Sequence, residues 1–204
     1  MLERKYLENK VRTSLGSIDI SDGYIFNPVH NAYFKAHPLG NLLHISPGNV
    51  FAGCIDSLIN GLLSKNLNIL KMASADPVFP LLFAKSIQEA DPEKIISDKF
   101  VIISFRGGDK RIEYLLKEKC NGIVVWGSSE VAKYYRSTTP AKCRLIEYGP
   151  RISLAIVTDK IKNSLNIEKF ANNLVTDIVY WEQRACSSPQ LLYIENPDNA
   201  FKIN

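Results

Sequence analysis

The chain has 204 residues, 46% of them hydrophobic and 23% charged, which is ordinary for a soluble globular protein of one or two domains. The formal net charge of +4 is scattered along the chain; it favours small polyanions such as nucleotides or coenzyme A and speaks against nucleic-acid binding. The apolar runs are shorter than the ~18 residues that a membrane helix needs, and the charged first residues predict no signal peptide.

The N-terminal part of the chain precedes any regular pattern. Residues 1–17 predict a short charged helix that ends at Gly16, because glycine is favoured just past the end of a helix. Residues 23–40 are rich in proline, glycine and aromatic residues and predict an extended, irregular arm. We therefore expect residues 1–36 to form a helix and an arm ahead of the first domain.

Apolar strands alternate with amphipathic helices over the middle of the chain. Strands are expected at residues 41–46, 67–72, 100–105, 122–127 and 143–148. Helices are expected at residues 50–66, 76–90, 107–120 and 128–137. The second of these helices is expected to open with Asp76 as its N-cap and Pro77 as its first residue. This alternation favours a parallel sheet covered by helices on both faces, which is a Rossmann-like α/β fold.

The pattern changes near Tyr148. Two further strands are expected at residues 151–158 and 190–195, with a helix at residues 167–185 between them. We therefore expect residues 37–147 to form the Rossmann-like domain and residues 148–204 to form the beginning of a second α/β domain.

Cysteines are widely spaced in this chain and never form a Cys-x-x-Cys pair. They are Cys54, Cys120, Cys143 and Cys186. This spacing does not fit the usual zinc-binding patterns, so we predict no metal site. Nothing else in the sequence indicates secretion, and we therefore expect reduced thiols and a cytoplasmic protein.

Four loops follow the predicted strands, at the edge of the sheet where open α/β folds bind ligands. They are 46-SPGN-49, 71-KMAS-74, 106-RGGD-109 and 127-GSSE-130. Asn49 presents an amide that can donate hydrogen bonds, although asparagine is also a common helix cap. Lys71 can reach a ribose or a phosphate, although a lone lysine is usually solvated.

The Gly-Ser turn at the fourth of these loops opens a helix. Gly127 and Ser128 place backbone N–H groups and the positive end of the helix dipole where a pyrophosphate can bind. The same two residues also suit an ordinary helix cap. The turn at residues 106–109 is in the first place a tight strand-to-helix turn and in the second place a wall of a cofactor site.

Cys186 lies where a helical pattern breaks into small polar residues. A nucleophilic cysteine needs a stabilised thiolate and a base to take its proton. Arg184 supplies a nearby positive charge, and Glu147 at the end of a strand is the candidate carboxylate base. The histidines all lie early in the chain, so a Cys–His pair is poorly supported, with His44 as an open alternative.

Taken in order, these loops resemble the aldehyde dehydrogenase superfamily. The marks of that superfamily are a Pro-x-Asn turn, a lysine after the next strand, a Gly-Ser-x-Glu turn, a Glu-x-Gly segment and a glutamine ahead of a cysteine. They stand here as Pro47-Gly48-Asn49, Lys71, Gly127-Ser128-Ser129-Glu130, Glu147-Tyr148-Gly149 and Gln183 to Cys186. The strings HISPGNVF, VVWGS and EQRACSSPQ are most similar to the long-chain fatty acyl-CoA reductases that supply aldehyde in bacterial bioluminescence.

The resemblance covers residues 37–196 and implies an NADPH-dependent reduction of a long-chain acyl-CoA or acyl-protein thioester to the fatty aldehyde. It makes Cys186 the nucleophile that accepts the acyl group, with Asn49 and the backbone N–H of Cys186 as donors to the oxyanion. It also implies that Lys71 binds the adenosine ribose and that the Gly127–Ser128 turn binds the pyrophosphate.

Two positions bear on the cofactor and on the base. Ser74 stands where the family has a ribose-binding glutamate, and the missing carboxylate removes repulsion against a 2′-phosphate, so NADPH is favoured over NADH. Glu147 matches the general base of the family, which activates a hydrolytic water. A reductase has to suppress that water, so the role of Glu147 stays open.

The family's catalytic domain continues well beyond the cysteine, whereas this chain ends soon after it. We therefore expect a fragment with weak or no nucleotide binding and little activity alone. Two other interpretations stay open: a cysteine acyltransferase or thioesterase without a nicotinamide, and an inactive nucleotide-binding module. As partners we expect the acyl substrate and either a second copy of the chain or an acyl-transferring enzyme, with no nucleic acid and no membrane span.

Overall fold

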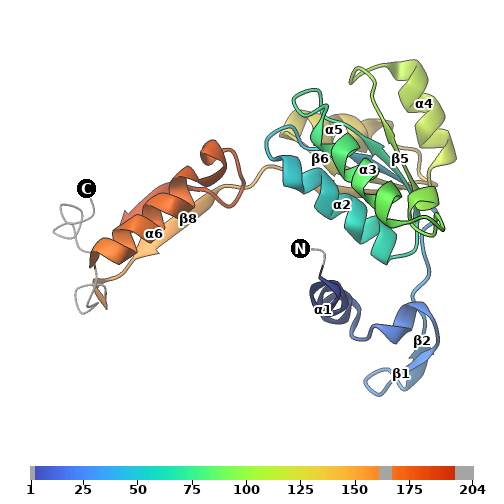
Figure 1. The fold of residues 1–204 in the computed structure, drawn as a ribbon, viewed down its shortest axis with the longest axis horizontal. Coiled ribbons are helices and arrows are strands. Elements are labelled where there is room, and N and C mark those ends of the chain that lie inside the picture. The colour runs from blue at the N-terminus through green and yellow to red at the C-terminus, as the bar shows by residue number, and fades with distance from the viewer. Residues whose placement is uncertain (1–2, 161–166, 196–204) are drawn as a thin grey trace. The chain divides into compact units, whose positions relative to one another are not determined.

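The structure is a computed structural model that describes residues 3–160 and 167–195 (Figure 1). The chain divides into two compact units, residues 1–148 and residues 149–204. Among the described residues, no helix combines the length and the hydropathy that a membrane span requires.

A parallel sheet forms the core of the first unit. Its strands are β3 (Asn41–Ile45), β4 (Leu67–Lys71), β5 (Phe100–Ile103), β6 (Gly122–Trp126) and β7 (Arg144–Tyr148). The connections contain α2 (Phe51–Leu63), α3 (Phe79–Ala90), η2 (Ser97–Lys99), α4 (Lys110–Lys119) and α5 (Ser129–Thr138). The strand order is β5-β4-β3-β6-β7, and every neighbouring pair is parallel. The predicted Rossmann-like α/β fold is therefore confirmed.

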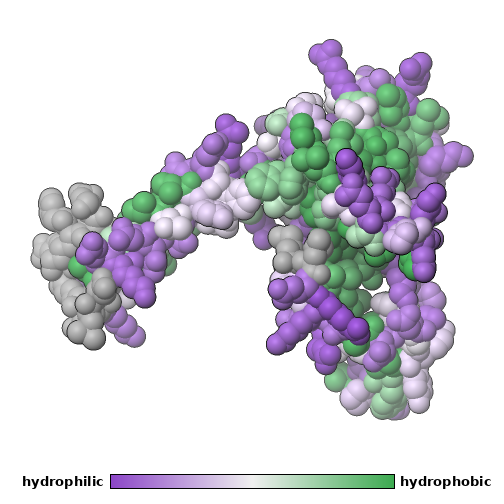
Figure 2. Space-filling view, viewed as in Figure 1, coloured by the Kyte–Doolittle hydropathy of each residue, from purple (hydrophilic) through white to green (hydrophobic). Residues whose placement is uncertain are grey.

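Alternation along the strands decides which helices cover which face of the sheet. Leu43 and Ile45 of β3 belong to a buried cluster that packs against α4 and α5. Leu70 of β4 belongs to a second buried cluster that packs against α2 and α3. Because successive side chains of a strand point to opposite faces, each pair of helices covers one face (Figure 1). Leu81 and Leu82 of α3 are exposed, and apolar residues gather on the face of the first unit that Figure 2 shows.

The start of α3 differs from the prediction. Pro77 lies before the helix, and the first turn instead contains Pro80, which lacks the N–H that would have no partner there. Asp76 still acts at this helix end, because its Oδ1 accepts a hydrogen bond from the backbone N–H of Phe79 at 3.1 Å. The prediction was therefore wrong about the N-cap, which is Val78, and about the first residue, although the carboxylate of Asp76 still accepts a backbone N–H of the first turn.

The N-terminal segment contains α1 (Arg4–Leu15), η1 (Asp19–Ser21), β1 (Ile25–Asn27) and β2 (Ala32–Phe34). Helix α1 ends at Gly16, whose φ of 84° is left-handed as the prediction required. The arm is more regular than predicted, because β1 and β2 pair as an antiparallel hairpin. Asn27 Oδ1 accepts the N–H of Val29 at 2.9 Å and so turns the chain between the two strands.

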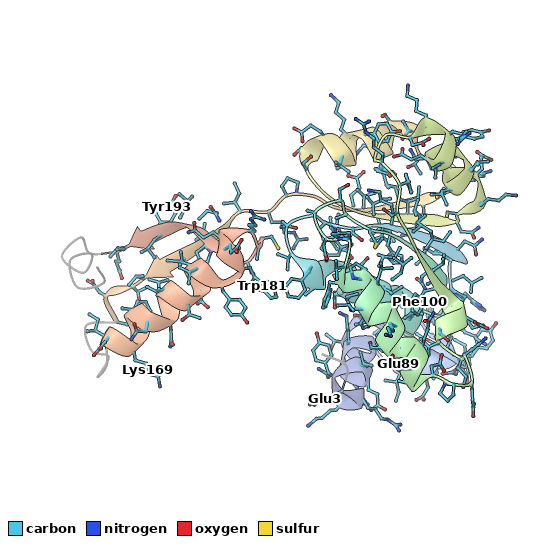
Figure 3. All side chains as sticks on the ribbon, turned by 45° about the horizontal axis from the view of Figure 1, so that its top comes forward. Glu3, Glu89, Phe100, Lys169, Trp181 and Tyr193 are labelled. Carbon is cyan, nitrogen blue, oxygen red and sulfur yellow. The ribbon has the colours of Figure 1, made fainter. Side chains whose placement is uncertain are left out.

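The second unit contains β8 (Ser153–Val157), α6 (Ile167–Val179), η4 (Tyr180–Gln183) and β9 (Pro189–Ile194). Strands β8 and β9 are parallel, and Tyr193 of β9 is exposed (Figure 3). The helix is shorter than the predicted 167–185, because the backbone turns left-handed at Trp181, Glu182 and Gln183. Ser188 Oγ donates to the carbonyl of Tyr180, and Gln190 Nε2 donates to that of Gln183, which satisfies carbonyl groups that a longer helix would have used.

A buried ion pair within α4 faces α5. Glu113 and Lys117 are 3% and 4% exposed, and Lys117 Nζ lies 3.5 Å from Glu113 Oε2. The ammonium donates to Thr138 Oγ1 at 2.6 Å and lies 4.6 Å from the ring centroids of Tyr134 and Tyr135. Tyr134 Oη donates to Glu113 Oε2 at 2.6 Å. The pair is thus enclosed by hydrogen-bond partners and aromatic rings of α5.

This enclosure predicts a change of stability at alkaline pH. The hydrogen bond to Glu113, assisted by burial, raises the pKa of Tyr134 to about 12, whereas an unfolded tyrosine ionises near pH 10. The stabilisation is therefore present below about pH 10 and is lost as the pH rises from about 10 to 12. We expect the stability advantage of the wild type over Tyr134→Phe, measured by urea unfolding, to shrink across that interval. A constant difference would show that Tyr134 ionises equally in both states.

Candidate functional site

The candidate site residues of the first unit gather at the C-terminal edge of the sheet. The direction of winding reverses between β3 and β6, and this switch point is where doubly wound folds bind ligands. Ser46 Oγ, directly after β3, is buried and has no hydrogen-bond partner among the described residues. A buried hydroxyl group without a partner is costly, so this position suits a polar ligand.

Lys71 is a buried cation at this edge. It is the last residue of β4 and is 9% exposed, and its Nζ lies 5.5 Å from the ring centroid of Phe105. Within the described part of the chain, no carboxylate lies within ion-pair distance of it. Burial lowers the pKa of Lys71, and the charge of Glu113 opposes that shift. An ammonium in this state is stabilised by an anionic or hydroxyl-bearing ligand.

The N-terminus of α5 is exposed at the same edge. Ser128 is the N-cap, and its Oγ accepts the N–H of Val131 at 3.5 Å. At Gly127 a side chain would meet Val131 at 3.0 Å, which explains the glycine. A hydrogen bond from Ser128 lowers the pKa of Glu130. The turn therefore combines the cap that the sequence predicted with the geometry of an anion site.

The loops after β3 and β4 lie against each other. A Cβ atom at Gly48 would stand 3.7 Å from the Cβ of Ala75. Asn49 and Ser74 are both exposed in these loops. Asn49 is not the N-cap of α2, because Val50 occupies that position. The structure thus brings the amide of Asn49 and the hydroxyl of Ser74 to neighbouring loops.

Glu147 is held by Arg136 of α5. The guanidinium Nε lies 3.0 Å from Glu147 Oε1, and Nη2 donates to the second carboxylate oxygen. The hydrogen bond from Arg136 is the main cause that lowers the pKa of Glu147. The carboxyl group is therefore ionised, with both oxygens engaged, which makes it a weak proton acceptor in this arrangement.

Cys186 lies in a turn of the second unit. Ala185 and Ser188 nearby are 9% and 2% exposed, whereas Cys186 itself is exposed. Ser153 Oγ donates to the carbonyl of Cys186 at 2.5 Å, and the N–H of Ser188 donates to the carbonyl of Ala185 at 3.1 Å. The thiol therefore projects from a backbone that is fixed on both sides.

Two further features surround this turn. Left-handed backbone at Trp181, Glu182 and Gln183 precedes it, and such conformations cost about 1–2 kcal/mol for residues other than glycine. Figure 3 places Trp181 just past the C-terminal end of α6. Arg184, which the sequence suggested as the positive partner of the thiolate, has its Nε 3.7 Å from Glu182 Oε2.

In the described ranges, no cluster of three or more His, Cys, Asp or Glu side chains could hold a metal ion.

The sequence interpretation missed one feature of the edge. The rings of Trp126 and Tyr148 stack with centroids 4.0 Å apart and planes at 8°. Both residues end a strand, directly before Gly127 and Gly149. Aromatic residues at two neighbouring strand ends were the signal that could have indicated the stack.

The chain matches a known family and several curated proteins. Residues 1–202 match the family model described as acyl-CoA reductase (LuxC). A long-chain acyl-protein thioester reductase of Photobacterium phosphoreum is 32% identical over 193 residues, which are 94% of this chain and 38% of that protein. A protein of the same description from Photorhabdus laumondii is 29% identical over 199 residues, which are 97% of this chain and 40% of that protein. The chain thus spans 38% to 40% of the length of these relatives.

Solved structures share the fold at lower identity. Glyceraldehyde-3-phosphate dehydrogenase GapN from Methanocaldococcus jannaschii, solved with NADP, gives a TM-score of 0.70 at 17% identity, covering 93% of this chain and 41% of that one. Lactaldehyde dehydrogenase from Escherichia coli gives 0.67 at 19% identity, covering 82% and 34%. The fold is therefore that of the aldehyde dehydrogenases, and the family match over residues 1–202 shows that the chain belongs to the acyl-CoA reductase (LuxC) family.

Proposed function

We propose that the chain serves an NADPH-dependent reduction of long-chain acyl thioesters to aldehydes, in which Cys186 accepts the acyl group. The observation that carries the proposal is the exposed thiol of Cys186 in a turn fixed on both sides. The other cysteines of the chain are buried. Relatives described as long-chain acyl-protein thioester reductases support the same class of substrate.

The edge of the sheet fits a nicotinamide nucleotide. The buried ammonium of Lys71 suits a ribose hydroxyl or a 2′-phosphate, and the exposed N-terminus of α5 at Ser128 suits the pyrophosphate. The unsatisfied hydroxyl of Ser46 adds a polar group at the switch point. When bound, the reduced nicotinamide would supply the hydride that converts the acyl thioester to the aldehyde.

The first covalent step takes place at the thiol of Cys186. Its thiolate forms a bond to the carbonyl carbon of the incoming thioester, the old carbon–sulfur bond breaks, and the departing thiolate takes up a proton. Asn49 keeps its proposed role as a donor to the negative charge that develops on the carbonyl oxygen. Ser153 and the buried Ser188 hold the turn in place.

The state of Glu147 supports the reductase over the thioesterase alternative. A hydrolase needs a base that is available to activate water. Both oxygens of Glu147 are bound by Arg136, and the ion pair holds the pKa of Glu147 below its ordinary value. A carboxylate engaged in this way is a weak base for a hydrolytic water, which supports the reductase as the proposed function.

The experiment that tests this function is a two-stage assay on the chain. Labelled long-chain acyl-CoA is added first, and an adduct that hydroxylamine removes is measured. NADPH is added second, and the released product is identified. Aldehyde supports the reductase and fatty acid supports a thioesterase, whereas the absence of an adduct contradicts both and favours an inactive nucleotide-binding module.

Ser74 is predicted to set the preference between the two nicotinamide nucleotides. A carboxylate at this exposed position would repel a 2′-phosphate, and each tenfold change in affinity corresponds to about 1.4 kcal/mol. We expect wild type to bind NADPH more tightly than NADH, and Ser74→Asp to reduce that ratio by about tenfold. Equilibrium titration of both nucleotides measures the ratio. Ser74→Asn, which has the size of aspartate without its charge, should keep the wild-type ratio. Tighter binding of NADH than of NADPH by wild type would contradict the prediction.

A further inference from the structure

We propose that Trp126 and Tyr148 form an aromatic plate that binds the nicotinamide ring of the dinucleotide. The inference rests on the nucleotide site proposed above and adds a contact to it. The two residues are register partners on β6 and β7, and their rings stack with a centroid distance of 4.0 Å. Tyr148 remains 37% exposed, so the plate is accessible at the edge of the sheet.

The indole is held in one orientation by a buried hydrogen-bond chain. Trp126 Nε1 donates to Ser57 Oγ of α2 at 3.0 Å. Ser57 Oγ lies 2.8 Å from His44 Nδ1, and His44 Nε2 lies 3.0 Å from Asn68 Oδ1. These contacts connect three strands of the sheet to α2 beneath the plate.

The direction of this chain follows from its far end. Asn68 Nδ2 donates to the carbonyl of Asn66 at 2.7 Å, which leaves Asn68 Oδ1 as an acceptor for His44 Nε2–H. His44 Nδ1 therefore accepts from the Ser57 hydroxyl, and the lone pairs of that hydroxyl accept from the indole. Burial lowers the pKa of His44, which agrees with a neutral ring.

A glycine makes room for this chain. A Cβ atom at Gly61 of α2 would stand 1.9 Å from Asn68 Oδ1 and 2.9 Å from His44 Nε2. Any side chain at this position would displace the two polar groups. The plate is thus supported by a complete buried network rather than by an accidental contact of two surface rings.

Strand alternation assigns the plate to the nicotinamide half of the ligand. Trp126 contacts Ser57 and therefore lies on the face that α2 covers. Leu70 of β4 packs on the face that α2 covers, and its neighbours Ile69 and Lys71 point to the other face. Ile69 packs there on the side of α4 and α5, so Lys71 lies on that side as well. With the adenosine ribose at Lys71 and the pyrophosphate at Ser128, the nicotinamide ring reaches the face of the sheet that carries the plate.

The chemistry of the ligand suits the plate. A nicotinamide ring is planar, and aromatic side chains stack on flat heterocycles. The rings of Trp126 and Tyr148 are already stacked in nearly parallel planes and need no reordering to accept a third ring on an outer face. Replacing one stacking aromatic side chain by alanine lowers the affinity for the stacked ring about tenfold.

The test uses the full chain with Trp181→Phe, which leaves Trp126 as the remaining tryptophan of the sequence. Titration with NADP⁺ should quench the emission of Trp126, whereas adenosine 2′,5′-bisphosphate, which lacks the nicotinamide, should bind without quenching. Calorimetry should show that Tyr148→Ala weakens NADP⁺ binding about tenfold. Tyr148→Phe, which keeps the aromatic ring, should bind NADP⁺ as tightly as wild type. Neither variant should change the affinity for the bisphosphate.

The outcomes separate the plate from the nucleotide site. An equal loss of affinity for both ligands in Tyr148→Ala would assign Tyr148 a structural role and overturn the plate. The plate is also overturned if NADP⁺ binds to the Trp181→Phe variant and Trp126 emission does not change. If neither ligand binds to wild type, the nucleotide site itself fails and the plate fails with it, which the bisphosphate arm reveals.

Discussion

Replacing Cys186 by alanine is expected to abolish the adduct with a labelled long-chain acyl-CoA. The exposed thiol of Cys186 can form the thioester, whereas alanine offers no nucleophile. We expect the hydroxylamine-sensitive label to fall by at least about a hundredfold, to the level of an unreactive protein. Mass spectrometry of the intact chain, before and after hydroxylamine, measures the adduct directly.

The control for this variant is Cys54→Ala. Burial raises the pKa of the Cys54 thiol to about 11, and its Sγ donates to the carbonyl of Phe51 at 3.0 Å, so Cys54 is poorly suited to attack a thioester. The control should therefore label like wild type. Equal labelling of wild type and Cys186→Ala would assign the acyl group to another residue and overturn the proposed function.

The fold was predictable because its signals are local. Apolar runs of strand length alternate with amphipathic helices, and a parallel sheet buried on both faces is the arrangement that such a pattern requires. The position of Lys71 also followed, since a lysine directly after a buried strand lies at the ligand-binding edge of the sheet. Its burial without an ion-pair partner among the described residues did not follow, because that depends on Phe105 and the helices packed around it.

Contacts between distant segments could not be predicted from the sequence. Arg136 and Glu147 are eleven positions apart on a helix and a strand, and nothing local marks them as partners. The left-handed turn after α6 was missed for a similar reason. It depends on Ser188 and Gln190, whose side chains return to carbonyl groups near the helix end. Helical periodicity continues through Trp181, Glu182 and Gln183, where the backbone is left-handed, and so favoured a longer helix.

The buried Glu113–Lys117 pair of α4 carries the largest expected effect on stability. Lys117→Met removes the ammonium and leaves the Glu113 carboxylate buried at 3% exposure, with Tyr134 and the N–H of Gly108 as hydrogen-bond donors. Removing one partner of a buried pair costs about 3–5 kcal/mol, because the remaining charge is not compensated. We expect a loss of that size in the free energy of unfolding, measured by urea denaturation.

A double variant and a surface control distinguish the buried charge from lost packing. Glu113→Gln combined with Lys117→Met removes both charges and should recover most of the loss, because the cost arises from the uncompensated carboxylate. Lys142→Met breaks an ion pair with Glu118 on the protein surface and should cost about 1 kcal/mol or less. If the double variant is as unstable as the sum of its two single variants, the aromatic enclosure of Lys117, rather than its charge, holds α4 against α5.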